Sequence, residues 1–262
     1  VLNELLVDID YIFHQAAFVS VPLSMENPNE CFEVNAAGTV QLMSAAARAG
    51  VKRLVFASSA AVYGDNPNIP LQESAELQPQ SPYAVSKLVD ELYKDLYTEN
   101  FGLEVVALRY FNVFGPNQAP DSDYAAAIPI FIRRMIQDRQ PVVYGDGGQS
   151  RDFIYVEDVA RANVLAAEAD QASGEAVNIC SGEEISILDL IHSIGGVLNK
   201  NPEIIFEDPR PGDIYRSAGD PSYAEELLGF KPVHSLESGL KKTAESIASL
   251  KSTNNQNLLE ST

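Results

Sequence analysis

Tyr83 and Lys87 are four positions apart in the segment SPYAVSK, residues 81–87. On a helix, positions i and i+4 share one face, so the lysine ammonium can sit beside the phenol and favour its ionised form. Free tyrosine titrates near pH ~10, and a tyrosine that acts as a base at neutral pH needs such help. Ser58 and Ser59 end a strand-like run upstream, and a serine hydroxyl there could hold the oxygen whose proton Tyr83 removes. Taken alone, the spacing also fits a chance pair on a solvated helix face.

The elements that must position these side chains follow an alternating pattern. Short apolar runs alternate with longer helical segments, which is typical of βαβ units that feed a parallel sheet. The predicted strands are 10–14 (buried), 53–57, 104–108, 176–179 and 204–206, with short strands near Val142 and Phe153. The predicted helices are 28–49, 83–100, 126–137, 156–167, 186–197, 222–228 and 236–250. The sequence therefore predicts an α/β fold with a Rossmann-like parallel sheet and a small C-terminal lobe.

The composition is that of a globular protein, with 262 residues of which 45% are apolar. A formal net charge of −19 argues against nucleic acid or an anionic membrane as a partner, because either would be repelled. No run approaches the roughly 18 apolar residues of a membrane-spanning helix, and no signal peptide is evident, so we expect a cytoplasmic protein. Cys31 and Cys180 lack metal-ligand spacing and the histidines are scattered, so no metal site is predicted.

Five segments occur in a fixed order: FASSAAVYG at 56–64, SPYAVSK at 81–87, LRYFNVFGP at 108–116, GDGGQSRDFIYVEDV at 145–159 and RPGD at 210–213. Together they resemble the extended short-chain dehydrogenase/reductase family, specifically its NAD-dependent nucleotide-sugar epimerases and dehydratases. The resemblance runs from about Asp8 to about Leu250. It is strongest to the UDP-glucose and UDP-N-acetylglucosamine 4-epimerases, and it implies NAD as the cofactor and a UDP-sugar as the substrate.

The resemblance also implies a division of the chain. Residues 1–115, with contributions from about 140–180, would form a partial NAD-binding Rossmann domain; 116–250 would form mainly the substrate-binding lobe, and 251–262 a flexible tail. The glycine-rich dinucleotide fingerprint should precede the first strand and is not in the sequence. Elements of ordinary length predict roughly 60 further residues upstream. The alternative is a naturally shortened protein that binds the cofactor pyrophosphate poorly or not at all.

On the cofactor side, the resemblance points to the loop after the first strand. His14, Ala16 and Ala17 match a loop that lies along the dinucleotide, where small residues let the backbone approach it; a tight core turn is the alternative. Asn35 matches an asparagine that bonds backbone near the site, which is a structural role. The cofactor-side residues implied are His14, Ala16, Ala17, Asn35, Ser58, Tyr83 and Lys87.

The catalytic residues implied are Ser59, Tyr83 and Lys87. In the related 4,6-dehydratases, the two positions after the catalytic serine or threonine carry an aspartate and a glutamate, and related decarboxylases tend to keep the glutamate. Here these positions are Ala60 and Ala61. Oxidation and reduction without elimination is the chemistry that remains.

On the substrate side, Asn112 matches an asparagine that contacts the diphosphate, although it could instead satisfy a turn. Arg151 and Arg210 would supply the planar, permanent charges that a diphosphate needs, unless they pair with neighbouring aspartates. Asp213 matches the acid that accepts the nucleotide ribose hydroxyls. Ser217 matches a position whose small size admits a 2-acetamido group, unless the loop alignment is shifted. With Ser59 against the sugar, the substrate-side residues are Ser59, Asn112, Arg151, Arg210, Asp213 and Ser217.

The resemblance implies NAD-dependent inversion at C4 of a UDP-hexose, either UDP-glucose and UDP-galactose or their N-acetylated pair. Tyr83, as phenolate, would take the C4 hydroxyl proton while hydride moves to NAD, and the 4-keto sugar would turn and be reduced on its other face. A net reductase, a dehydratase and a non-catalytic nucleotide-sugar-binding relative are the alternatives. The nucleotide base and the choice between NAD and NADP stay open.

Helices 28–49 and 83–100 resemble a pair that forms a four-helix dimer interface in the family. We therefore expect a homodimer through these two helices.

Overall fold

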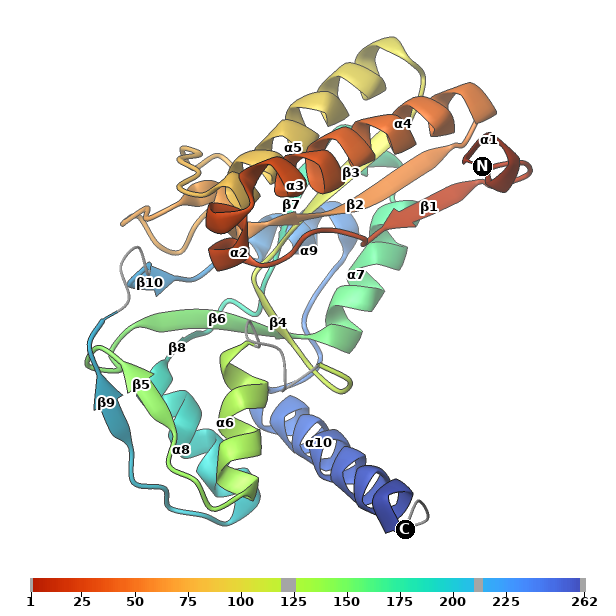
Figure 1. The fold of residues 1–262 in the computed structure, drawn as a ribbon. Helices are drawn as coiled ribbons and strands as arrows, with labels where there is room; N and C mark the ends of the chain where they lie inside the picture. Colours follow the sequence, from red (N-terminus) through yellow and green to blue (C-terminus); the bar gives the residue numbers. More distant parts are fainter. Residues whose placement is uncertain (1, 119–125, 210–213, 260–262) are drawn as a thin grey trace.

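The computed structural model describes residues 2–118, 126–209 and 214–259 (Figure 1). Arg210 and Asp213, two of the predicted substrate residues, lie outside this part of the chain. Strands and helices alternate along it and build a mostly parallel α/β architecture, so the predicted fold class is confirmed.

The main sheet is parallel and has the strand order β1-β2-β3-β7. Its strands are β1 (Tyr11–His14), β2 (Arg53–Ser59), β3 (Glu104–Tyr110) and β7 (Ala176–Ile179). The strands β2 and β3 are covered on both faces, which explains their unbroken apolar runs. Ser59 pairs with Tyr110 where both strands end, so the predicted catalytic serine lies at the carboxyl edge of the sheet.

Helices cover both faces of this sheet (Figure 1). One face carries α3 (Pro28–Phe32), a π-helical turn η1 (Glu33–Ala37), α4 (Gly38–Ala49) and α5 (Pro82–Asn100). The other face carries α7 (Val156–Glu168) and α9 (Ser222–Leu228). Successive side chains of a strand point to opposite faces of the sheet. Leu54 therefore packs in the core under α4 and α5, and Val55 packs in the core under α7 and α9.

A second layer lies below the main sheet (Figure 1) and centres on β6 (Ser150–Tyr155). The strand β6 pairs in parallel with β4 (Asn112–Phe114) and β10 (Arg216–Ser217) and antiparallel with β8 (Glu184–Ser186). A separate pair joins β5 (Val142–Tyr144) to β9 (Ile205–Glu207). The helices α6 (Ala127–Ile136), α8 (Ile187–Leu198) and α10 (Leu236–Leu259) share one apolar core with this layer. The division into domains at residue 115 stays a prediction.

Four short helical segments were not predicted: α1 (Leu2–Leu5), α2 (Val21–Glu26), η2 (Ala60–Tyr63) and η3 (Asp170–Ala172). Each is too short to show a helical period in the sequence. None of the helices in the described residues combines the length and apolar composition needed to cross a membrane.

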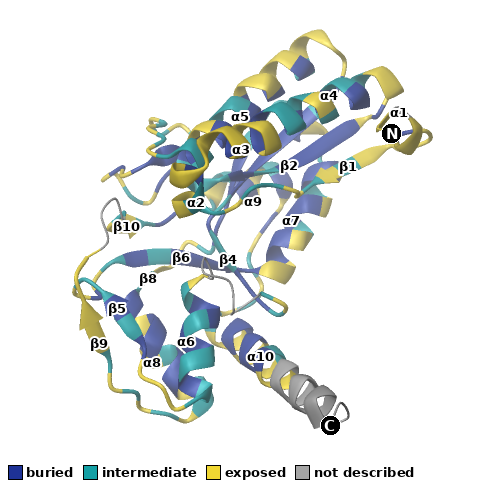
Figure 2. Ribbon diagram, viewed as in Figure 1, coloured by how far each residue is buried: buried dark blue, intermediate teal, exposed yellow. Residues whose placement is uncertain are grey.

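One expectation about the first strand was wrong. The strand β1 is not buried (Figure 2): it is an edge strand of the main sheet, and its side chains alternate between exposed and half-buried. Phe13 in this strand is 46% exposed. Helix α10 continues to Leu259, beyond the predicted end at residue 250, and the flexibility of the segment 251–262 stays a prediction. That segment contains no glycine or proline to end the helix.

A glycine in α10 tests how closely this helix packs on the second layer. A Cβ at Gly239 would lie 2.7 Å from Phe114 Cζ and 2.8 Å from Tyr155 Cδ2, whereas nothing lies within 4 Å of one at Gly196 in α8. We expect Gly239→Ala to destabilise the protein by about 1–3 kcal/mol through overpacking. Gly196→Ala should stabilise it by about 0.5–1 kcal/mol, because alanine loses less backbone entropy in a helix.

Urea unfolding of the two variants and the wild type measures both effects. Equal stabilisation by the two substitutions would show that α10 does not pack as described.

Candidate active site

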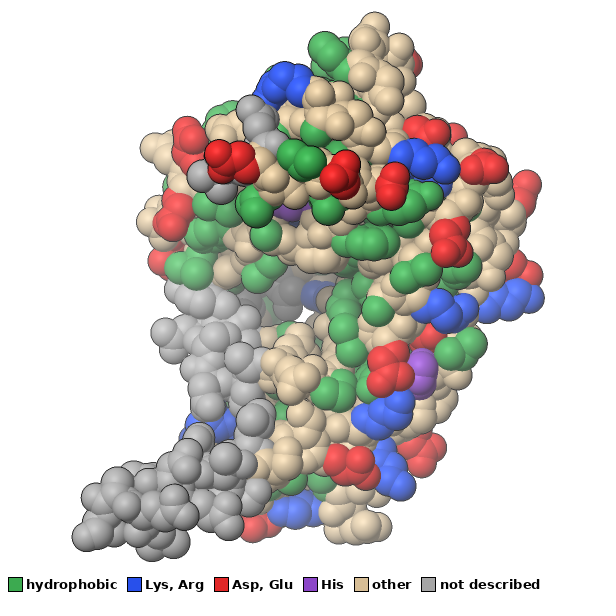
Figure 3. Space-filling view, turned by 90° about the vertical axis from the view of Figure 1, so that its right-hand side faces the viewer, with side chains coloured by type: hydrophobic (Ala, Val, Ile, Leu, Met, Phe, Trp, Pro, Cys, Tyr) green, Lys and Arg blue, Asp and Glu red, His purple; other side chains and the backbone are tan. Residues whose placement is uncertain are grey.

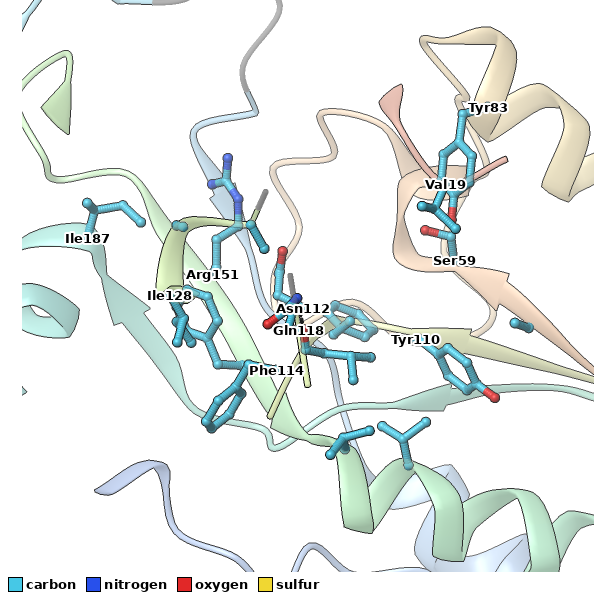
Figure 4. A pocket seen from close by; sticks show the side chains of 18 of the residues that line it. Val19, Ser59, Tyr83, Tyr110, Asn112, Phe114, Gln118, Ile128, Arg151 and Ile187 are labelled. Carbon is cyan, nitrogen blue, oxygen red and sulfur yellow. Dashed lines mark hydrogen bonds between the residues drawn. The ribbon is translucent and has the colours of Figure 1, made fainter. Parts of the chain in front are cut away.

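The ends of β2 and α5 bring Ser59 and Tyr83 together. Ser59 is the last residue of β2, and its Oγ accepts a hydrogen bond from the Ala61 N–H at 3.1 Å, which starts η2. Tyr83 lies in the first turn of α5, where Ser81 Oγ accepts from the Ala84 N–H at 3.1 Å and Pro82 holds the first helical position. The helix start and the strand end therefore fix the two side chains, and their oxygens point toward one another (Figure 4).

Tyr83 is half-buried, and the pKa of its phenol reflects several opposing effects. Desolvation by burial raises the pKa of Tyr83, a hydrogen bond with the Ser59 hydroxyl lowers it, and electrostatic interactions with Cys31 and Asp90 raise it further. The net pKa is above the ordinary tyrosine value. In this environment the neutral phenol is favoured, and Ser59 is the neighbour that opposes this tendency.

Lys87 differs from its predicted electrostatic role. It lines the same cavity as Tyr83, as the i, i+4 spacing implies, and only 3% of the residue is exposed. Its Nζ lies 3.8 Å from Oδ2 of Asp90, and burial lowers the pKa of Lys87 while the Asp90 charge raises it. The groups that shift the pKa of Tyr83 do not include Lys87. The lowering of the Tyr83 pKa that the helix spacing predicts is therefore not seen, and burial has the largest effect on the pKa of this phenol.

A cavity of about 800 Å³ lies between the main sheet and the second layer. Figure 3 shows the surface hollowed at this level of the molecule. The predicted residues that line the cavity are Ala17, Ser58, Ser59, Tyr83, Lys87, Asn112 and Arg151. They come from the β1–α2 loop, β2, α5, β4 and β6 (Figure 4), so distant segments meet here.

Four other predicted residues lie beside the cavity without lining it. His14 Nε2 lies 2.9 Å from Thr39 Oγ1, and burial together with the Lys87 charge lowers the pKa of His14 to about 4. Asn35 holds the loop after β1, because its Oδ1 accepts from the Phe18 N–H at 2.7 Å. Ala16 belongs to the same loop. Ser217 lies in β10, where it pairs with Arg151 of β6.

The structure bears on two alternatives left open by the sequence: that Asn112 only satisfies a turn, and that Arg151 pairs with the neighbouring Asp152. Asn112 Nδ2 donates to the Asp152 carbonyl at 3.1 Å, so it satisfies backbone as well as lining the cavity. The Asp152 carboxylate accepts hydrogen bonds from Ser181 and from the Gly182 N–H. Arg151 Nη1 donates to the Ser150 carbonyl at 2.8 Å.

Sequence reasoning missed several polar lining residues, including Gln15, Tyr110 and Gln118. The Tyr110 hydroxyl donates to Gln15 Oε1 at 3.1 Å and accepts from Asn163 at 2.7 Å. Gln15 follows β1 directly and Tyr110 ends β3, so their position at the carboxyl edge of the sheet was the available signal for these two residues. The apolar floor was also missed, and it consists of Phe114, Ile128, Phe131, Val142, Val143, Phe153 and Ile187.

A buried polar network supports the site from the α5 side. Arg109 of β3 forms two hydrogen bonds with the Glu91 carboxylate of α5, at 3.0 and 2.7 Å. The Ser58 hydroxyl donates to the same carboxylate at 2.5 Å. Arg109 also donates to the Tyr63 hydroxyl at 2.8 Å, and burial raises the pKa of Tyr63 to about 12. This network ties helix α5 to β2, the strand that ends in Ser59.

A Rossmann-like sheet with a serine, a tyrosine and a lysine at its carboxyl edge defines a protein of the short-chain dehydrogenase/reductase type. The model of the NAD dependent epimerase/dehydratase family matches residues 1–180. The chain belongs to this family, which confirms the resemblance.

Individual relatives carry related names. A putative UDP-glucose 4-epimerase of Methanocaldococcus jannaschii is 39% identical over 236 residues, which is 90% of this chain and 76% of the relative. The solved UDP-N-acetylglucosamine 4-epimerase of Methanobrevibacter ruminantium M1, in complex with UDP-N-acetylmuramic acid, is 43% identical with a TM-score of 0.92, over 95% of this chain and 80% of that one. A UDP-glucuronic acid 4-epimerase of Bacillus cereus, solved with UDP-glucuronic acid and NAD, is 34% identical with a TM-score of 0.88, over 95% and 78%.

The buried ion pair gives a prediction about stability. Glu91→Gln would leave Arg109 buried without its carboxylate, and removing one partner of a buried pair typically costs about 3–5 kcal/mol. Glu184→Gln is the matched control, because Glu184 pairs at 2.7 Å with Arg216, whose side chain is 54% exposed. The loss there should be far smaller, because water screens the pair. Comparable losses in urea unfolding would contradict the structural role given to the Glu91–Arg109 pair.

Proposed function

We propose that this protein is a UDP-hexose 4-epimerase that uses NAD. The observation that carries the proposal is the meeting of the Ser59 hydroxyl and the Tyr83 phenol in a cavity that Lys87 and Arg151 also line. Such a cavity offers a proton acceptor, a hydroxyl to hold the reacting oxygen and a cation for an anionic group.

The residues present fit the nicotinamide and ribose part of NAD. Small side chains, Ala17 and Ala57, line the cavity beside Ser58, so a flat ring can approach the sheet edge. The buried ammonium of Lys87 supplies donors for ribose hydroxyls. The B. cereus relative solved with NAD supports the choice of this cofactor.

In the proposed reaction Tyr83, as phenolate, takes the proton from the C4 hydroxyl of the hexose. Ser59 holds the C4 oxygen and links it to the phenol. Bound NAD, held by Lys87 beside Ala17 and Ala57, would supply reversible hydride transfer at C4, so that the sugar could be oxidised on one face and reduced on the other. Arg151 holds the diphosphate, so the hexose can turn while the nucleotide part stays fixed. Tyr83 then returns the proton, and no net oxidation results.

An epimerase is favoured over a dehydratase because elimination needs an acid and a base beside the catalytic serine. Ala60 and Ala61 follow Ser59 and begin η2, and neither side chain can transfer a proton. The proposed reaction therefore consists of oxidation and reduction at C4 without elimination.

The charges around the cavity favour a neutral hexose over a uronic acid. Lys87 and Arg151 are the basic residues in the described lining, and the proposal gives them to the ribose and the diphosphate. From Tyr110 to Ile132 the sequence contains no lysine or arginine, so this stretch offers no cation for a sugar carboxylate. The small Ser217 keeps the N-acetylated pair among the proposed substrates.

Tyr83→Phe tests the proposal, because it removes the acid–base group and leaves the ring. We expect interconversion of UDP-glucose and UDP-galactose, or of their N-acetyl forms, to fall by at least about 100-fold without added cofactor. Bound dinucleotide and thermal unfolding should stay unchanged. Tyr93→Phe, on the exposed side of the same helix, is the matched control and should be fully active. A Tyr83→Phe enzyme that keeps a tenth of the wild-type rate would refute the assignment.

We further propose that the protein is a homodimer through α3, α4 and α5. Val85, Leu92 and Leu96 on α5 are 46%, 60% and 48% exposed, and their spacing places them on one side of the helix. Phe32 of the neighbouring α3 is 53% exposed. A second copy that covers this stripe would form a four-helix interface.

Leu96→Asp places a charge in the proposed interface and should halve the mass measured by light scattering. Val164→Asp is the control, because Val164 is 49% exposed on α7, across the sheet. We expect that variant to stay dimeric. A monomeric wild-type protein, or two variants of equal mass, would contradict the proposed interface.

A further inference from the structure

Asp90 is a buried acid to which the proposed mechanism gives no role. It lies on α5 three residues after Lys87 and is 0% exposed. Within the described residues, neither of its carboxylate oxygens accepts a hydrogen bond of ordinary geometry. Buried carboxylates are normally satisfied by donors or neutralised, so such a group is costly where it stands.

The surroundings of Asp90 come from several elements. Lys87 of the same helix lies 3.8 Å away, and the Thr39 hydroxyl of α4 favours the charged form of Asp90. Thr39 also contacts His14 at the end of β1. Cys31 of α3 interacts electrostatically with Lys87 and with Tyr83. The titratable groups around Asp90 are therefore Lys87, Tyr83, Glu91, His14 and Cys31.

The neighbouring acid, Glu91, has a different partner. Its carboxylate is neutralised by Arg109 of β3, through an ion pair of 2.7 Å. Asp90 and Lys87 consequently form their own pair, on the side of the helix that faces α3 and α4. The charge on Asp90 acts on Lys87 and on the Tyr83 phenol, which lies one turn before Lys87 on the helix.

We infer that Asp90 is a positioning residue for the proposed epimerase reaction: its carboxylate holds the Lys87 ammonium in the cavity wall and limits the positive charge felt by Tyr83. The inference rests on the proposed function. With its carboxylate 3.8 Å from the Lys87 ammonium, Asp90 offsets the positive charge that the helix spacing brings toward the phenol. Its own pKa is raised by burial to about 7, so the carboxyl can change charge near neutral pH.

The sign of the effect follows from the charges. A negative charge near an acid disfavours loss of its proton, so Asp90 raises the pKa of both Tyr83 and Lys87. Removing it should lower both. If the acidic limb of the pH–rate profile reports Tyr83 and the alkaline limb Lys87, both limbs should move to lower pH together.

Asp90→Asn keeps the size of the side chain and removes its charge. In the intact holoenzyme we expect both limbs of the kcat profile to move down by about one pH unit. Asp95→Asn is the matched control, because Asp95 lies on the same helix with its side chain 56% exposed, and it should leave both limbs in place. Unmoved limbs in Asp90→Asn, or limbs that move in opposite directions, would overturn the inference. If Asp90→Asn does not fold, Asp90→Ser tests the same charge.

A measurement without turnover separates this inference from the proposed function. Tyrosinate absorbance is recorded against pH for each protein and for the same protein with Tyr83→Phe, and the difference reports Tyr83 alone. We expect this titration also to fall by about one pH unit in Asp90→Asn. A shifted titration in a protein without epimerase activity would refute the proposed function and keep the charge coupling. Normal activity with an unshifted titration would refute the role of Asp90.

Discussion

The buried ion pair between Glu91 and Arg109 is the interaction on which the site depends. It holds helix α5 on strand β3, and the Ser58 hydroxyl extends it to β2. The first turn of α5 carries Tyr83, and the residue after Ser58 is Ser59, the other hydroxyl of the proposed reaction. The same contacts that place the helix on the sheet therefore set the distance between phenol and serine. A buried polar network is favourable only when each donor and acceptor has a hydrogen-bond partner. Here Arg109 and Ser58 both donate to the Glu91 carboxylate.

The second constraint is the balance of charge around the phenol. The chain carries a net charge of −19, and the cavity nevertheless contains Lys87 and Arg151. One of these cations is paired with a buried carboxylate, so it does not act on Tyr83 with its full charge. Burial raises the pKa of the Tyr83 phenol, and the hydrogen bond with Ser59 lowers it. The phenol is therefore favoured in its neutral form in this structure, and Ser59 is the neighbour that stabilises the anion.

The cavity joins two kinds of surface. The sheet edge is small and polar, with Ala17, Ala57 and Ser59, whereas the floor from α6, β5 and β6 is aromatic and aliphatic. A nucleotide sugar has a corresponding distribution of groups, with a planar base, an anionic diphosphate and a polar hexose. This correspondence supports the proposed substrate class beyond the family relationship, because it concerns residues from parts of the chain that no single motif covers.

The sequence by itself determined the order of the elements and the parallel sheet, and its motifs pointed, through the family resemblance, to Ser59, Tyr83 and Lys87 as the proposed catalytic residues. The elements depend on local periodicity and on the fixed geometry of strands and helices, so the helix predicted at 83–100 and a strand that ends near Ser59 follow from short windows. Two adjacent acids, Asp90 and Glu91, look equivalent in the sequence. The tertiary structure paired Glu91 with Arg109 of β3 and Asp90 with Lys87, and it left β1 exposed. Only the fold could decide these points, because burial and the nearest charges come from residues far apart in the chain, and they set every pKa in the site.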